Sequence, residues 1–258
     1  MRWDPAQYSQ FNDERSRPFF DLVGRIGATA PARVVDLGCG AGELTATLAD
    51  CWPGAEIVGI DNSAEMITKA EAHTGDRVRF ETGDIASWQP DGEIDVVVSN
   101  AALQWVTGHQ QMLPGWLEGL PAGAWFAFQV PGNFNAPSHV LMRQLADSPG
   151  WADRLTGVLR HADVVEDPDG YARIFLDAGW RVEAWETTYY HLLPGENPVL
   201  EWVRGSGLRP VLNALDPGAA AEFERQYTAL IQEAYPKTPH GTFFPFRRIF
   251  CVGHKPTV

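Results

Sequence analysis

Cysteine is scarce in this chain of 258 residues, which has only Cys39, Cys51 and Cys251. Their odd number and wide spacing exclude the disulfide framework of a small secreted domain and match no zinc-ligand pattern. We therefore expect reduced thiols and no metal site.

Long apolar runs are missing as well. No stretch reaches the ~20 consecutive apolar residues of a membrane helix, and the first residues, Met1–Pro5, lack the apolar core of a secretory signal. We expect a cytoplasmic protein that meets no membrane. The composition is 45% hydrophobic with ten tryptophans, which is ample for the packed core of one structural domain.

Positive charge is outnumbered. Lys and Arg total 20 against 33 Asp and Glu, so the formal net charge is −13. Nucleic acid needs a basic surface, so we expect no nucleic-acid partner, and nothing indicates an obligate protein partner. A small anion can still bind, because salt screens the global field beyond ~10 Å and a local cationic group then dominates.

A glycine-rich turn follows the first apolar β-branched run. Asp36 is followed by glycines at alternate positions, Gly38, Gly40 and Gly42, and glycine lets a ligand lie against bare backbone. A dinucleotide fingerprint would need a third glycine at position 43, where Glu43 would oppose a pyrophosphate. The pattern instead resembles motif I of class I methyltransferases, whose cofactor S-adenosylmethionine (SAM) carries a positive sulfur and no phosphate.

Three more predicted strands end in residues that could bind the cofactor, and they follow one another along the chain in the same order as in class I methyltransferases. Asp61 can accept hydrogen bonds from ribose hydroxyls. By the same resemblance, Asp84 meets the adenine amino group, Ile85 packs on the ring, and Asn100 borders the methionine part of SAM. The strands expected before these residues are 55–60, 78–81 and 94–100.

Each signal alone has a purely structural explanation, because glycine turns are common and Asp61 or Asp84 could cap a helix or a turn. Their order within residues 34–105 favours the cofactor. Cys39 fills a position that needs a small residue, and its thiol has no expected catalytic role. The implied cofactor-binding residues are Asp36, Gly38, Cys39, Gly40, Gly42, Asp61, Asn62, Asp84, Ile85, Asn100, Ala101, Leu103, Trp105, Tyr8 and Arg17.

The alternation of strand and helix patterns predicts an α/β fold. We expect the Rossmann-like class I methyltransferase fold, a seven-stranded, mostly parallel sheet with helices on both faces and a helical insertion before the last strand. The expected parts are a lid and helix (1–30), a SAM-binding core (31–131) and the rest of the sheet (132–258), with substrate-binding insertions at 132–168 and 195–241.

Local patterns give the remaining elements. A helix over 109–120 is expected to be interrupted at Pro114, and the helical stretch 197–235 to break near Pro210 and at Pro217-Gly218. The other expected helices and strands are 18–26, 125–130, 171–178, 181–190 and 243–252.

Segments outside the glycine turn resemble the trans-aconitate 2-methyltransferases over nearly the whole chain. They are Trp3-Asp4-Pro5, Glu14–Pro18, Leu103-Gln104-Trp105, His139–Arg143, Thr187–His191 and Gly207–Pro210. The family has a proline next to its C-terminal arginine, whereas this chain has Arg247 and Arg248. Arg248 is the better match, and the role of Arg247 stays open.

The resemblance implies that SAM methylates one carboxylate of the tricarboxylate trans-aconitate, giving a monomethyl ester and S-adenosylhomocysteine. A carboxylic acid with a pKa near ~4 is already ionised at neutral pH, so no catalytic general base is required. Catalysis would consist of positioning and desolvation. Arginine forks would hold the other carboxylates. The candidate substrate-binding residues are Arg209, Arg248, Tyr190, His191, His139 and Arg143.

Structural roles remain open for these residues too. Any one arginine could form a surface ion pair, and His191 could cap a strand end. Residues 1–17 are expected to act as a lid over SAM, although Tyr8 and Phe11 could instead staple the first helix.

Three other functions remain open. A malonyl-carrier-protein methyltransferase shares the nucleophile but needs a docking surface for an acidic protein. An amine or phenol methyltransferase needs a base or an aromatic slot. A SAM-binding protein without activity would lack a cationic cluster facing the methyl group.

Overall fold

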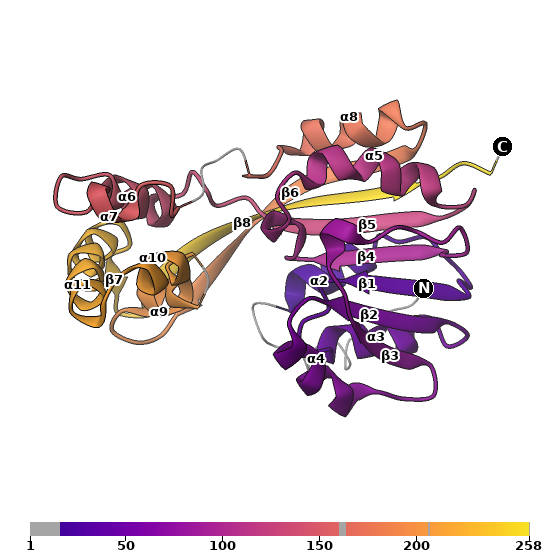
Figure 1. Ribbon diagram of the computed structural model, residues 1–258, viewed down its shortest axis with the longest axis horizontal. Helices are drawn as coiled ribbons and strands as arrows, with labels where there is room; N and C mark the ends of the chain where they lie inside the picture. The colour runs from indigo at the N-terminus through magenta and orange to yellow at the C-terminus, as the bar shows by residue number, and fades with distance from the viewer. Residues whose placement is uncertain (1–15, 160–163, 206, 258) are drawn as a thin grey trace. The chain divides into compact units, whose positions relative to one another are not determined.

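The computed structural model describes residues 16–159, 164–205 and 207–257. Its centre is a β-sheet with the strand order β3-β2-β1-β4-β5-β8-β6, and the two-residue β7 pairs with β8 beside this path (Figure 1). The strands are β1 (Arg33–Leu37), β2 (Glu56–Asp61), β3 (Val78–Thr82), β4 (Val96–Asn100), β5 (Trp125–Pro131), β6 (Arg181–Leu193), β7 (Lys237–Thr238) and β8 (Gly241–His254). The seven long strands are those predicted, and β7 is too short to leave a periodic signal.

Helices connect the strands. The α-helices are α2 (Arg17–Val23), α3 (Glu43–Cys51), α4 (Ala64–Ala70), α5 (His109–Gly119), α6 (Pro137–Ala146), α7 (Ala152–Leu155), α8 (Pro168–Asp177), α9 (Pro198–Arg204), α10 (Arg209–Ala214) and α11 (Pro217–Ala234). Short 3-10 helices are η2 (Glu71–His73), η3 (Ile85–Ser87) and η4 (Leu103–Trp105). The predicted breaks near Pro210 and Pro217 are confirmed, since each proline lies in the first turn of a new helix, where its missing N–H costs nothing.

The predicted interruption at Pro114 is wrong. Helix α5 runs continuously from His109 to Gly119 with Pro114 inside it. The proline removes one helical hydrogen bond, while Leu113, Trp116 and Leu117 are fully buried and hold the turns on both sides. Burial of these side chains offsets the local defect.

Strands β1 to β5 are parallel to their neighbours, with β1 between β2 and β4. Consecutive residues Val96, Val97 and Val98 are all fully buried. Since successive side chains point to opposite faces, both faces of the sheet are covered. The predicted fold class is confirmed, and the carboxyl ends of these strands lie along one edge.

The chain divides into two compact units. Unit 1 comprises Met1–Val130, Val165–Glu186 and Arg248–Val258, and unit 2 comprises Pro131–Val164 and Thr187–Arg247. Each has its own hydrophobic core, with Trp116 and Phe128 in unit 1 and Phe223 and Phe244 in unit 2. The three-part division expected from the sequence stays a prediction.

In unit 2, two tyrosines hold the first turn of α6. The Tyr227 hydroxyl donates to the Ser138 carbonyl at 2.6 Å, and the Ser138 N–H donates to the Tyr235 hydroxyl at 3.1 Å. The N-terminal N–H groups of a helix lack internal partners, so Tyr235 satisfies one of them from outside the helix. Helices α6 and α11 are thereby tied together.

None of the helices in the described ranges has both the length and the apolar character needed to cross a membrane.

Candidate active site

The glycine turn is fixed by hydrogen bonds across to β2. The N–H groups of Gly38 and Cys39 donate to the Ile60 carbonyl at 2.7 and 3.0 Å. Gly38 has a φ of +82°, and a Cβ atom there would lie 2.2 Å from Cβ of Ala102, so only glycine fits. At Gly40 (φ +56°) an added Cβ would meet no atom within 4 Å. The backbone at Gly40 is therefore open to a ligand.

Asp61 ties this turn to the end of β2. Its Oδ2 accepts from the Gly40 N–H at 3.0 Å, and its Oδ1 accepts from the Ser63 N–H at 2.9 Å. A carboxylate oxygen can accept more than one hydrogen bond, so Asp61 can also accept from the hydroxyls of a ribose. The turn-acid role and the cofactor role are compatible.

Asp36 is buried beneath the turn, with 3% of its surface exposed. Its Oδ2 accepts from the Thr45 hydroxyl at 2.5 Å, while Oδ1 has no hydrogen-bond partner among the described residues. Burial raises the pKa of Asp36 to about 6, the Thr45 hydrogen bond opposes the rise, and the negative charge of Asp61 adds to it. A buried, under-satisfied carboxylate next to the turn favours a cationic ligand such as a sulfonium.

Other predicted cofactor residues lie at the same edge. The exposed Asp84 caps η3, its Oδ1 accepting from the Ala86 N–H at 2.9 Å. Ile85 lies near the turn, because a Cβ atom at Gly38 would be 3.5 Å from its Cδ1. Leu103 is fully enclosed in the core, whereas Trp105 is 50% exposed.

The remaining members of the set lie elsewhere or have other contacts. Cys39 is buried, and burial raises the pKa of its thiol, which keeps it protonated. Asn62 is exposed just after β2. Arg17 begins α2, where its Nε lies 3.7 Å from Asp21. Tyr8 and the expected lid up to residue 15 lie outside the described residues.

The turn after β4 is strained. Ala101 has a φ of 54°, the one positive φ among the described non-glycine residues. Its N–H donates to the Gln129 carbonyl at 3.0 Å, and its own carbonyl accepts from the Gln104 side chain at 2.6 Å. A left-handed alanine costs about 1–2 kcal/mol, so these bonds hold it in place.

A row of polar side chains crosses β4, β5 and β8. The Gln129 Nε2 donates to Asn100 Oδ1 at 2.7 Å, and the Arg248 Nη1 donates to Gln129 Oε1 at 3.4 Å. Gln129 is fully buried, and Arg248 is 6% exposed. The structure thus places Arg248 in unit 1, joined through one residue to Asn100.

Arg247 differs from its neighbour. Successive side chains of β8 point to opposite faces, and the Arg247 backbone exchanges hydrogen bonds with the Asn133 side chain at 2.9 Å in both directions.

Sequence reasoning missed Gln129, although an amide between apolar residues of a buried strand is a readable signal.

The other candidate substrate residues belong to unit 2. His191 is buried and stacks on Trp202 with 4.9 Å between ring centroids. Tyr190 is 70% exposed, since adjacent strand residues face opposite ways. The structure therefore does not bring Tyr190 and His191 together.

His139 and Arg143 share α6. Burial, and secondarily the charge of Arg143, lowers the pKa of His139 to about 4, so the imidazole is neutral at pH 7. Arg143 donates to the Phe134 carbonyl at 2.5 Å. A Cβ atom at Gly207 would lie 3.2 Å from the His139 Nε2, so the segment that carries the exposed Arg209 passes close to His139.

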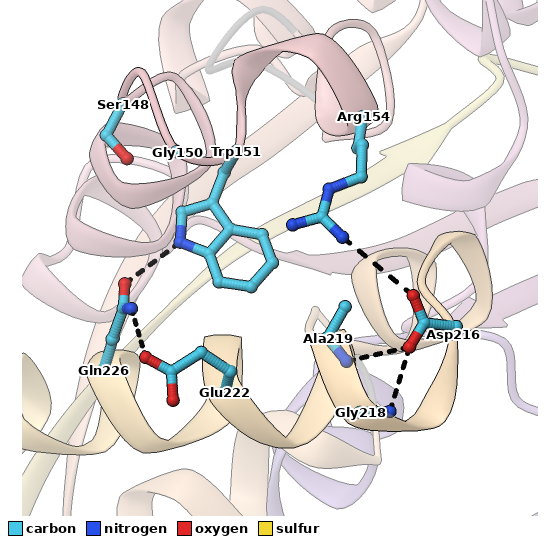
Figure 2. A pocket seen from close by; sticks show the side chains of 9 residues that line it. All are labelled: Ser148, Gly150, Trp151, Arg154, Asp216, Gly218, Ala219, Glu222 and Gln226. Atoms are coloured by element: carbon cyan, nitrogen blue, oxygen red, sulfur yellow. Dashed lines mark hydrogen bonds and ion pairs between the residues drawn. The ribbon is translucent and has the colours of Figure 1, made fainter.

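A separate hollow in unit 2 has a volume of about 650 Å³ (Figure 2). Its lining residues are Ser148, Gly150, Trp151, Arg154, Asp216, Gly218, Ala219, Glu222 and Gln226. None of the predicted site residues lines it. Arg154 lies over the Trp151 ring and faces Asp216, and Gln226 joins Trp151 to Glu222. Two carboxylates would repel a polycarboxylate, so this hollow is a poor acceptor site.

The geometry of unit 1 and the comparisons define the class. A family model described as a methyltransferase domain matches residues 34–120. A solved structure of the YcgJ protein from Bacillus subtilis superposes with a TM-score of 0.59 at 16% identity, covering 92% of this chain and 97% of that protein. Phosphoethanolamine N-methyltransferase 2 of Haemonchus contortus, solved with S-adenosyl-L-methionine, gives a TM-score of 0.55 at 14% identity and 93% coverage of this chain, which spans 53% of that enzyme. The chain has the class I methyltransferase fold.

Sequence similarity identifies the family within this class. A trans-aconitate 2-methyltransferase from Streptomyces coelicolor is 52% identical over 263 aligned positions, covering 98% of this chain and 87% of the relative. The chain belongs to the trans-aconitate 2-methyltransferase family, as the resemblance in the sequence predicted.

Proposed function

We propose that this protein transfers the methyl group of SAM to a carboxylate of trans-aconitate, releasing S-adenosylhomocysteine and a monomethyl ester. The observation that carries this proposal is the 52% identity over 98% of the chain. The similarity extends across both units, and the acceptor must be recognised by residues other than the glycine turn.

The residues at the edge of unit 1 fit SAM. We assign the open backbone at Gly40 and the carboxylate of Asp61 to the nucleoside, Asp84 to the adenine amino group, and Asn100 to the methionine part. SAM supplies an electrophilic methyl group on a sulfonium. The buried carboxylate of Asp36 gives the edge a negative charge that suits this cation.

Arg248 is the side chain best placed to hold the acceptor. It is a buried cation two hydrogen bonds from Asn100, in a protein whose net charge of −13 would otherwise repel a polycarboxylate. An arginine fork binds a carboxylate with two parallel bonds and fixes its plane. The nucleophile arrives ionised, so the protein needs to orient it and exclude water rather than remove a proton.

The other five candidates, Arg209, Tyr190, His191, His139 and Arg143, remain proposals for the acceptor site. As a neutral imidazole, His139 can give one hydrogen bond but no charge. The exposed Tyr190 is the weakest of the five, because a site that excludes water needs enclosed groups.

The test is release of S-adenosylhomocysteine with trans-aconitate, cis-aconitate, isocitrate, citrate and a neutral phenol as separate acceptors. We expect the highest kcat/KM with trans-aconitate. Turnover of the phenol without turnover of any acid would overturn the proposal and favour a neutral-acceptor methyltransferase.

A further inference from the structure

Gln129 is a fully buried amide in the apolar strand β5. Burying an amide is costly unless its polar atoms are hydrogen-bonded. The side-chain amide of Gln129 meets this requirement, because its Nε2 donates to Asn100 and its Oε1 accepts from Arg248. In addition, the backbone carbonyl of Gln129 accepts from the Ala101 N–H. One residue therefore touches the predicted methionine-binding turn and the proposed acceptor-binding arginine.

The direction of these hydrogen bonds is fixed by chemistry. Arginine has only donors, so the oxygen of the Gln129 amide must face Arg248, and its NH₂ group must then face Asn100. Asn100 must in turn present its amide oxygen to Gln129, so the NH₂ group of Asn100 points away from Gln129. The chain Arg248–Gln129–Asn100 thus has a single polarity.

Charge explains why an amide suits this position. Glutamine has the length to bridge β4 and β8 and accepts from the Arg248 guanidinium without cancelling its positive charge. A glutamate would form an ion pair with Arg248 and compete with an acidic acceptor. It would also lose the donor that holds Asn100.

We infer that Gln129 is a positioning residue that sets the guanidinium of Arg248 and the amide of Asn100 relative to each other, and so aligns a carboxylate acceptor with the methyl group. This inference rests on the proposed function. Gln129 touches neither reactant and acts through its two neighbours.

The experiment compares Gln129→Glu and Gln129→Met with the wild type. Methionine keeps the length and burial of the side chain but removes both hydrogen bonds. We measure the KM and kcat for trans-aconitate, SAM affinity by calorimetry, and the Tm of each variant. The exposed Gln232 on α11 provides the matched control Gln232→Glu.

We expect Gln129→Glu to raise the KM for trans-aconitate at least ~10-fold, because the ion pair with Arg248 competes with the acceptor. Gln129→Met leaves the arginine charged but unaligned, so kcat should fall ~10-fold with a smaller rise in KM. SAM affinity should change less than these kinetic constants, because Asn100 is only one of the proposed SAM contacts, and Gln232→Glu should match wild type throughout.

The split between the kinetic constants separates positioning from mere packing. A packing defect lowers Tm and SAM affinity together with activity, whereas a positioning defect changes KM in Gln129→Glu and kcat in Gln129→Met in a folded protein that still binds SAM. Equal losses of SAM affinity and Tm without a split between KM and kcat would overturn the inference.

Failure of the inference and failure of the proposed function give different results. An active wild type with unaffected Gln129 variants overturns the inference alone. A wild type that neither methylates trans-aconitate nor binds it beside S-adenosylhomocysteine in calorimetry overturns both.

Discussion

Asp61 accepts two backbone N–H groups, from Gly40 and Ser63, and is proposed to accept the ribose hydroxyls as well. Asp61→Ala should loosen the turn and leave the ribose without its acceptor. We expect SAM affinity to fall by about 2–3 kcal/mol, or ~30–150-fold. Calorimetry on a folded variant tests this, with Asp61→Asn as the conservative control, and unchanged affinity of the alanine variant would remove the ribose assignment.

Asp36 links the same edge to pH. Burial raises its pKa from 3.8 to about 6, so between these values the folded protein binds a proton that the unfolded chain has lost. Stability of the SAM-free protein should therefore fall as the pH rises from about 4 to about 6 and stay level above. The amide oxygen of the Asp36→Asn variant would still accept from Thr45, so we expect this substitution to raise Tm at pH 7.5 and to have little effect near pH 4. If the Tm of the wild type and that of the Asp36→Asn variant changed with pH in the same way, this expectation would be contradicted.

The two arginines singled out for the acceptor differ in burial, Arg248 being enclosed and Arg209 exposed. Lysine keeps the charge but loses the fork, so both Arg→Lys variants should raise the KM for trans-aconitate and leave SAM affinity intact. We expect at least ~10-fold for Arg248→Lys and less for Arg209→Lys. Steady-state kinetics with trans-aconitate varied at saturating SAM test this expectation. A wild-type KM in both variants would mean that other residues hold the acceptor.

At the scale of elements, the first turn of α6 depends on two hydroxyls from outside the helix, and Tyr227 and Tyr235 both belong to the C-terminal part of unit 2. Tyr227→Phe removes one buried hydrogen bond and should cost about 1 kcal/mol of the free energy of unfolding. Urea denaturation measures this loss. SAM affinity should be unchanged, because the proposed cofactor residues lie in unit 1, and a large drop in SAM affinity would refute that separation.

Local sequence signals predicted the strands and the glycine turn to which the cofactor is assigned. The alternate glycines and the acids Asp61 and Asp84 each follow an apolar strand, and parallel strands bring their carboxyl ends to one edge. The bond from Arg248 to Gln129 joins residues 119 positions apart, and no local pattern reports such a pairing. The continuity of α5 through Pro114 was missed for a similar reason, since tertiary burial of Trp116 outweighed a local preference.

At the scale of the molecule, the two units have separate cores, and the proposed cofactor residues belong to one of them. Ligand binding stabilises most strongly the part that forms the site. With S-adenosylhomocysteine added, hydrogen exchange should slow more in β1, β2 and β4 than in α11. If hydrogen exchange slowed equally in α11, the two units would unfold together rather than separately.

Neither unit is one continuous stretch of the chain. Unit 1 is assembled from three separate stretches and unit 2 from two, so the polypeptide crosses from one unit to the other four times. No single cut yields either unit intact, and neither could be inherited or exchanged by fusion at a terminus. Recombination that replaces unit 2 must therefore exchange two internal inserts together, Pro131–Val164 and Thr187–Arg247.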